Sequence, residues 1–160
     1  MGLVKHIAKF KFLPAERLME YYPPFLFMGV KIEHVAKDYS SLRFSLPLRW
    51  YSKNTHGTMF GGFICAAADP VAAILCGRIF REAITWTKHQ FVDFIKPGKG
   101  RLHATVKITE ADIKAIHDAL SIKGKIIYEF EFNFYDAHEV LVAKVRNGVY
   151  LRAKKKKRDE

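Results

Sequence analysis

The chain has 160 residues, 49% of them hydrophobic, which is enough to bury the core of one domain. Its formal net charge of +11 favours an anionic partner, such as nucleic acid, an anionic membrane surface or a phosphate-bearing small molecule. On one helix, Cys65 and Cys76 would be about 16 Å apart, which excludes a disulfide and a shared metal. Free thiols of this kind indicate a reducing compartment, and we expect a cytoplasmic protein.

The first 24 residues are expected to form a helical extension in front of the main domain. A short helix is predicted over residues 14–22, with Pro14 in its first turn and the Pro-Pro pair at 23–24 ending it. The segment mixes lysines into its apolar residues and has no signal-peptide core or cleavage site.

Two strands are predicted next, over residues 25–35 and 39–47, and an apolar helix follows over residues 60–80. This helix has roughly the length of a membrane span. Against a span stand Pro70 and the central Asp69, which alone would cost about 2.5–3.5 kcal/mol in a bilayer. We therefore expect a buried helix, apolar on all sides, and no membrane span.

The remaining chain predicts four long strands with short connections. They cover residues 83–95, 101–109, 126–135 and 140–151, with a short helix or loop over 110–120. Short connections indicate an antiparallel sheet, whose apolar face needs a cover, and the helix over 60–80 is the only apolar element long enough. The expected fold is α+β, an antiparallel sheet wrapped around one long central helix. It forms a single domain over residues 1–151, followed by a basic, solvated tail over 152–160.

Asp69 is the only carboxylate in the apolar run and allows two interpretations. It is the N-cap of a helix that begins at Pro70, or it lies inside a longer helix and is used chemically. Local chemistry leaves these two interpretations nearly even. The adjacent Gly61 and Gly62 favour the longer helix, because glycines at a helix start leave backbone N–H groups approachable for an anion or oxyanion.

These residues resemble a known family. Asn54, the run Phe-Gly-Gly at 60–62 and Asp69 are similar in order and spacing to the hotdog-fold acyl-CoA thioesterases, specifically the PaaI-like branch. The resemblance covers roughly residues 25–151 and implies a hotdog fold. Phe60 stands where that branch has a histidine, so the chain resembles a variant with FGG in place of HGG. A less studied hotdog branch with "HGTMFGG" and "ADP" is a further resemblance.

The resemblance implies catalytic roles for four residues. Gly61 would donate its N–H to the thioester carbonyl, and Asp69 of the partner subunit would act as general base or nucleophile. Asn54 would hold the water or the thioester, and Thr87 would orient the water. Because such sites lie between subunits, a homodimer or homotetramer is expected.

Three further residues are expected to bind substrate. They are His56, Phe60 and Gly62. His56 is equally well explained as an ordinary loop histidine, and Phe60 as a core residue or as a wall of the acyl pocket.

The resemblance implies a hydrolase that cleaves the thioester of an acyl-CoA or acyl carrier by Asp-assisted attack of water. No cofactor is expected beyond the coenzyme A of the substrate, and no metal, because the histidines lack HxxxH and HExxH spacing. The alternative is a non-catalytic acyl-CoA- or lipid-binding hotdog protein. A dehydratase is less favoured, and a nucleic-acid binder least, because the aromatic residues of 128–134 alternate with acidic ones as in a half-buried strand.

Overall fold

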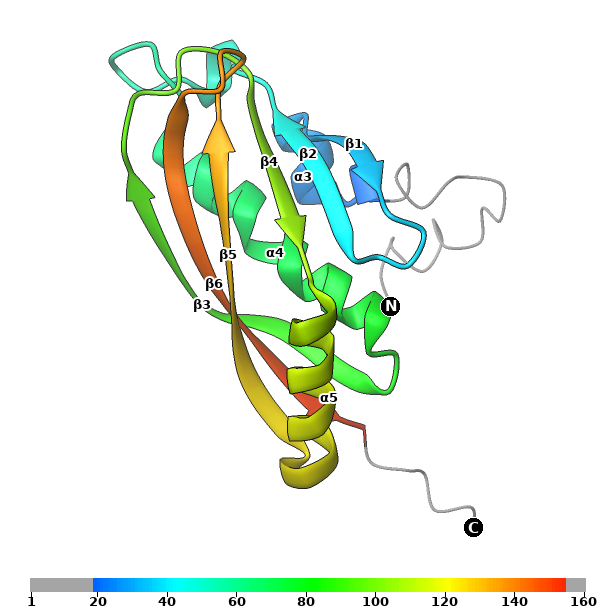
Figure 1. Cartoon of the computed structure of the whole chain (residues 1–160). Helices are drawn as coiled ribbons and strands as arrows, with labels where there is room; N and C mark the ends of the chain where they lie inside the picture. The colour runs from blue at the N-terminus through cyan, green and yellow to red at the C-terminus, as the bar shows by residue number, and fades with distance from the viewer. Residues whose placement is uncertain (1–18, 155–160) are drawn as a thin grey trace.

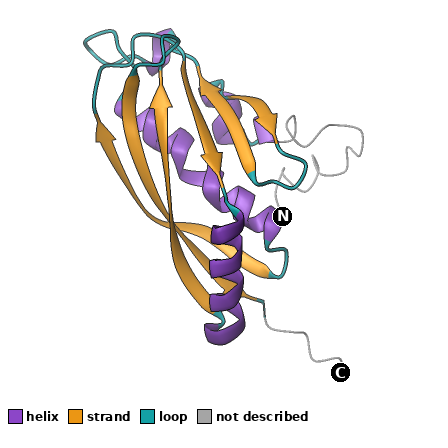
Figure 2. Ribbon diagram, in the orientation of Figure 1, coloured by secondary structure: helices purple, strands orange, loops and turns teal. Residues whose placement is uncertain are grey.

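The computed structural model describes residues 19–154, which form one six-stranded antiparallel sheet curved around a long helix, α4 (Figures 1 and 2). The strand order is β1-β2-β4-β5-β6-β3. This confirms the α+β architecture expected from the sequence. The strands are β1 (Lys31–Val35), β2 (Ser41–Leu46), β3 (Ala83–Phe94), β4 (Leu102–Lys107), β5 (Lys125–Tyr135) and β6 (Leu141–Ala153). The helices are α3 (Pro23–Met28), η1 (Trp50–Ser52), α4 (Gly61–Ile79) and α5 (Glu110–Lys123).

The strand predicted over 25–35 is wrong in its first half, where the chain forms α3. The prolines occupy the first positions of this helix, where their fixed φ suits a helix and a missing N–H costs nothing. Gly29 ends the helix in the left-handed region at φ 72°, and β1 follows. The helix predicted over 14–22 lies mostly outside the described residues, although Met19 and Glu20 are helical.

Helix α4 confirms the helix predicted over 60–80. It begins at Gly61, so Asp69 and Pro70 lie inside it and the N-cap interpretation of Asp69 is wrong. The prediction that the helix is buried on all sides is also wrong. Positions Gly62, Ala66 and Asp69 are exposed, and their spacing places them on one face. We call these three positions the exposed strip.

Helix α5 lies where only a short helix or loop was predicted. It has a capping box, in which the Thr109 hydroxyl accepts from the backbone N–H of Asp112 and the Asp112 carboxylate accepts from the backbone N–H of Thr109. Gly124 ends the helix at φ 69°. The connection from β4 to β5 therefore runs through a full helix rather than a turn.

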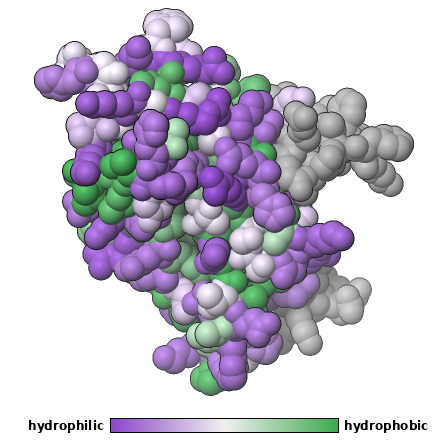
Figure 3. Space-filling view, turned by 45° about the horizontal axis from the view of Figure 1, so that its top comes forward, coloured by the Kyte–Doolittle hydropathy of each residue, from purple (hydrophilic) through white to green (hydrophobic). Residues whose placement is uncertain are grey.

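The core lies between α4 and the concave face of the sheet. Eight α4 residues are buried there, together with Phe130, Phe132 and Phe134 of β5, as the alternation in that strand predicts. Tyr128 of the same face is only partly buried. Hydrophilic residues predominate on the surface in Figure 3, with separate hydrophobic patches between them.

Among the described residues, α4 is the one helix long and apolar enough to cross a membrane, with a mean hydropathy of 1.5. In this fold the same helix packs against the sheet. The core helix of a soluble protein passes the same test of length and composition, so the test is weak evidence for a span.

Candidate functional site

The loop before α4 is organised by Asn54. Its Oδ1 accepts from the backbone N–H groups of His56 (2.9 Å) and Thr58 (3.1 Å), and its Nδ2 donates to the Thr58 hydroxyl (2.9 Å). Gly57, at φ 74°, makes the turn that these bonds close. The Asn54 amide is thus largely occupied in shaping this loop, although one Nδ2 hydrogen has no partner in these bonds.

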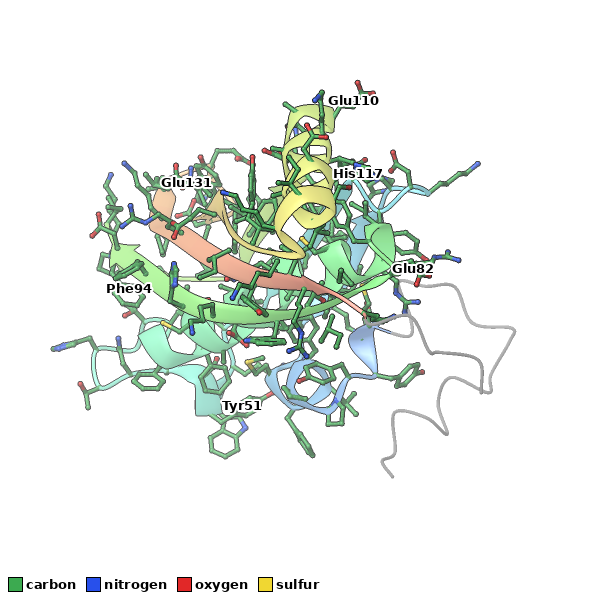
Figure 4. The ribbon with its side chains drawn as sticks, turned by 90° about the horizontal axis from the view of Figure 1, so that it is seen from below. Tyr51, Glu82, Phe94, Glu110, His117 and Glu131 are labelled. Carbon is green, nitrogen blue, oxygen red and sulfur yellow. The ribbon has the colours of Figure 1, made fainter. Side chains whose placement is uncertain are left out.

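A cleft of about 500 Å³ opens beside this loop at the start of α4. Its lining brings together three predicted site residues, Asn54, His56 and Gly61. Phe94, at the end of β3 and labelled in Figure 4, lines it as well. Lys96 also lines the cleft, and no Asp or Glu occurs in residues 39–68 or 94–109, which supply it. The cleft therefore lies in a cationic environment.

Two phenylalanine rings lie against the glycines that open α4. A Cβ added at Gly61 would approach the Phe94 ring to 2.8 Å, and one added at Gly62 would approach the Phe60 ring to 2.4 Å. Only glycine permits this approach without a shift of the rings. Both rings are about half exposed, at 52% for Phe60 and 53% for Phe94, so both have room to move. Phe60 is an exposed residue beside the site and not a core residue.

A second groove, of about 510 Å³, lies beside the middle of α4. It is lined by Asp69, Pro70, Arg78, Trp86 and Thr87, among others. The Asp69 side chain faces this open space as the only carboxylate on α4. The Thr87 hydroxyl does not bond that carboxylate. It donates to the backbone carbonyl of Asp69, at 2.6 Å.

The predicted site residues therefore form two groups within one protomer. Asn54, His56 and Gly61 lie at the first cleft, while Asp69 and Thr87 lie at the second groove. Eight helical positions separate Gly61 from Asp69, or about 12 Å along the axis. A single carbonyl group cannot touch both at that distance.

Sequence reasoning missed three residues next to the site, namely Phe94, Gln90 and Asn147. Asn147 on β6 is fully buried, and its Nδ2 donates to the carbonyls of Ala68 (3.2 Å) and Asp69 (3.0 Å). Gln90 on β3 donates to the Cys65 carbonyl (3.2 Å). The sequence contains a signal for Asn147. Residues of β6 alternate between core and surface, and Asn147 takes a position on the core side.

The two thiols of α4 are not poised as nucleophiles. Burial raises the pKa of the Cys76 thiol to about 12, with a further contribution from the negative charge of Asp112, and burial raises the pKa of Cys65 as well. Within residues 19–154, His, Cys, Asp and Glu side chains form no group of three that could hold a metal ion. The chemistry available at α4 is that of a carboxylate, backbone N–H groups and polar loop side chains.

Comparison with known proteins places the chain in a family. The family described as "Domain of unknown function (DUF4442)" matches residues 15–151. The chain belongs to the DUF4442 family. No curated protein matches it in sequence. The matched range includes every predicted site residue of this DUF4442 protein.

Solved structures show the fold of this DUF4442 protein. A Pseudomonas aeruginosa protein described as a probable thioesterase has a TM-score of 0.75 at 20% identity, over 89% of this chain and 97% of that one. The Escherichia coli PaaI protein from the phenylacetic acid degradation operon has a TM-score of 0.65 at 17% identity, over 96% and 97%. A Haemophilus influenzae thioesterase has a TM-score of 0.65 at 9% identity, over 84% of this chain and 86% of that one. The fold is the hotdog fold of thioesterase-type proteins.

Proposed function

We propose that this DUF4442 protein is a thioester hydrolase that acts on an acyl-CoA or acyl carrier at a site between two subunits. One observation carries the proposal. The only carboxylate of α4 lies on the exposed strip of an otherwise apolar helix, next to an open groove. A carboxylate is expensive on a surface that a partner covers, unless the site uses it.

The proposed dimer follows from how α4 runs along β3. Gly61 lies level with Phe94, Cys65 with Gln90, and Asp69 with Thr87. Cys65 is midway between Gly61 and Asp69. A twofold axis near the level of Cys65 and Gln90 therefore sets Asp69 of one subunit opposite Gly61 of the other.

The edge of the sheet supports the same axis. β3 is an edge strand of 12 residues that pairs only with β6. An edge of that length is open to pairing with another strand unless something covers it. Antiparallel pairing of two β3 strands about Gln90 covers both edges and buries both exposed strips.

In the proposed reaction, Asp69 takes a proton from water as the water oxygen bonds to the thioester carbon. The backbone N–H at Gly61, at the positive end of the α4 dipole, stabilises the oxyanion that forms. The C–S bond then breaks, and the thiolate leaves and takes up a proton, which gives a carboxylic acid and a thiol. Asn54 orients the water or the thioester. His56, Phe60 and Gly62 bind substrate.

The positive charge near the first cleft fits coenzyme A, which carries phosphates. Lys96 lines the first cleft. Lys53 and Lys99 are exposed close to the two segments of the chain that form this cleft. Lysine ammonium groups bind phosphate by charge-assisted hydrogen bonds. An acidic carrier protein with a phosphopantetheine arm fits the same charge.

Several hotdog neighbours described as thioesterases support the reaction class. A thioesterase-type protein of Staphylococcus aureus was solved as a Gln-to-Ala and a Glu-to-Ala variant, at positions fifteen residues apart. Asn54 and Asp69 are fifteen residues apart as well. The shared spacing supports Asn54 and Asp69 as a functional pair in a variant of the PaaI-like pattern.

A non-catalytic acyl-CoA-binding protein is the second candidate. It is favoured by the phenylalanine rings against Gly61 and Gly62, which lie over the start of α4 where an oxyanion would bind. In that case Phe60 marks lost chemistry.

The deciding experiment is a hydrolysis screen against short-chain, long-chain and aromatic acyl-CoAs. Asp69→Asn should lower the rate about 10²–10⁴-fold, the range for positioned proton transfer, and leave acyl-CoA binding intact. Asp118→Asn, an exposed carboxylate on α5, is the matched control and should keep the parent rate. Asn54→Ala should lower the rate of hydrolysis less than Asp69→Asn does.

Phe60→His separates the two candidates further. If the histidine of related proteins only supports the backbone, restoring it changes the rate little. A parent that binds acyl-CoA, hydrolyses none of the panel and gains activity with Phe60→His is the binding protein, and the hydrolase proposal is then wrong.

A further inference from the structure

Helix α4 is held to the sheet by an unusual set of side chains. Pro70 inside the helix has no N–H to donate to Ala66, and its ring crowds that carbonyl. On both sides of this break, side chains of β3 and β6 donate to α4 carbonyls. The acceptors are Cys65 (from Gln90), Ala68 and Asp69 (from Asn147), Asp69 again (from Thr87) and Ala73 (from Thr85, 3.0 Å).

Two of these donors converge on one oxygen, the backbone carbonyl of Asp69. The Thr87 hydroxyl is 2.6 Å away and the Asn147 Nδ2 is 3.0 Å away. They come from adjacent strands, since β3 pairs directly with β6. A carbonyl held from two directions cannot rotate or slide along the helix axis without breaking a bond, and the Cα from which the Asp69 carboxylate projects shares that constraint.

Burying the polar side chains of Asn147 and Gln90 costs free energy, which indicates that their hydrogen bonds to α4 serve a specific purpose. Asn147 is one of only three buried polar residues among residues 19–154. Asn147 and Gln90 are register partners, and the side-chain oxygens of both are buried without a hydrogen-bond partner. Turning either amide over would bring its oxygen against a helix carbonyl. The orientation is therefore fixed by the need to donate to α4, and an apolar residue at 147 would avoid the unpaired oxygen altogether.

We propose that Asn147 and Thr87 are positioning residues that fix Asp69, so that its carboxylate points into the groove at the angle the reaction needs. This inference rests on the proposed function, because it assigns the reacting carboxylate to Asp69. It also revises the role of Thr87, which acts through the Asp69 carbonyl and not by orienting water. Asn147 is fully buried and acts without touching substrate.

Three near-isosteric variants test the proposal, namely Thr87→Val, Asn147→Leu and the control Thr85→Val. Thr85 is a threonine on the same strand that makes the same kind of bond, one helical turn beyond Asp69. Thr87→Val and Asn147→Leu should each lower kcat for an acyl-CoA about tenfold or more with KM unchanged. Thr85→Val should keep the parent kcat. Thr87→Ser should restore the rate, because it returns the hydroxyl.

The double variant Thr87→Val/Asn147→Leu distinguishes positioning from direct action. If the two residues act through one carbonyl, the double variant lowers kcat by less than the product of the two single reductions. If their roles are independent, the two reductions multiply. Multiplying effects, or an unchanged kcat in both single variants of an active parent, overturn the proposal.

Amide hydrogen exchange over residues 65–73 gives a readout that does not depend on activity. It should rise in Thr87→Val and Asn147→Leu if these side chains hold α4, and unchanged exchange in both overturns the proposal. Because Asn147→Leu changes the packing of the core, Thr87→Val with its Thr87→Ser rescue stands alone as a test. A parent without hydrolysis overturns the proposed function, whereas an active parent with insensitive variants overturns only this inference.

Discussion

The two long helices of the chain are built on different principles. α5 follows local rules, with a capping box at Thr109, acidic residues in its first turn, Lys123 in its last turn and Gly124 at its C-terminal end. α4 has none of these at its start. Its N-cap is Phe60, which offers no side-chain hydrogen bond, and a proline interrupts it. α4 therefore depends on packing against the sheet, whereas α5 also carries its own helix signals at both ends.

Candidate functional residues lie on the helix that lacks these local signals. α5 satisfies its own ends and has Ile116 as its one fully buried residue, so local helix signals account for its sequence. α4 breaks local rules at Gly61, Gly62, Asp69 and Pro70, and its candidate site lies at those positions. Local rules are broken most often where a site requires it.

A charge placed on the exposed strip of α4 should have the strongest effect of all. Ala66→Arg places a charge in the middle of the exposed strip, where the proposed dimer buries it beside its symmetry mate. Like charges at an interface cost several kcal/mol, so the dimer should weaken by at least a hundredfold. Light scattering across a concentration series measures this, and thioester hydrolysis should fall with the dimer.

Ile122→Arg on α5 is the matched control for that experiment. Ile122 is 80% exposed, and the variant should keep both the mass and the activity of the parent. If the parent is monomeric at all concentrations, the proposed site between subunits is wrong.

The glycines at the helix ends should respond to alanine differently. Gly124 has φ 69°, where a Cβ is strained, so Gly124→Ala should cost about 1–2 kcal/mol of unfolding free energy. Gly61 has no such φ, and Gly61→Ala should change stability by less than about 1 kcal/mol. Its Cβ would instead push the Phe94 ring aside and alter hydrolysis or binding at the first cleft. Urea unfolding at one protein concentration, beside a hydrolysis assay, separates the two effects.

Removing the α5 cap should come next in size. Thr109→Ala deletes the hydroxyl that accepts from Asp112 and should cost up to about 2 kcal/mol. Phe60→Ala at the corresponding position of α4 removes no cap bond, so any cost there reflects lost ring contact with Phe63. Equal effects in urea unfolding would contradict the contrast between the helices.

Much of this fold could be predicted from the sequence, because its signals are periodic. The alternation of β5 and the apolar run of α4 placed both elements correctly. The apolar residues of α3 are compatible with a strand as well as a helix, and a Pro-Pro pair can either end one helix or, as here, begin the next. Thr109, Asp112 and Gly124 form a complete set of helix signals for α5, which the prediction of a short helix or loop does not take into account.

The site could be predicted only as a set of residue types. Asp69 inside α4 followed from the glycine pair, and the resemblance supplied Asn54 and Thr87. The Thr87 bond to a backbone carbonyl, the Asn54 loop and the buried Asn147 depend on contacts between distant segments, with 78 residues separating Asn147 from Asp69. No local pattern encodes such contacts. The alternation of β6 assigns position 147 to the core, but it does not show which carbonyls the Asn147 amide reaches.

The smallest expected effect depends on pH and again belongs to α5. Burial on its own raises the pKa of Asp112, but hydrogen bonds from Tyr128 and Thr109 outweigh it and hold the pKa below the ordinary value of 3.8. A carboxyl with a lowered pKa stabilises the fold above its ordinary pKa, and the stabilisation is lost as the pH falls through the lowered value. Tyr128→Phe removes the bond from the Tyr128 hydroxyl to Asp112 (2.6 Å) and should cost about 1 kcal/mol at pH 7. The difference from the parent should shrink well below pH 3.8, where Asp112 is protonated in both proteins. Urea unfolding at the two pH values measures it, and a cost that stays constant with pH would mean that ring packing, not the charged hydrogen bond, makes Tyr128 stabilising.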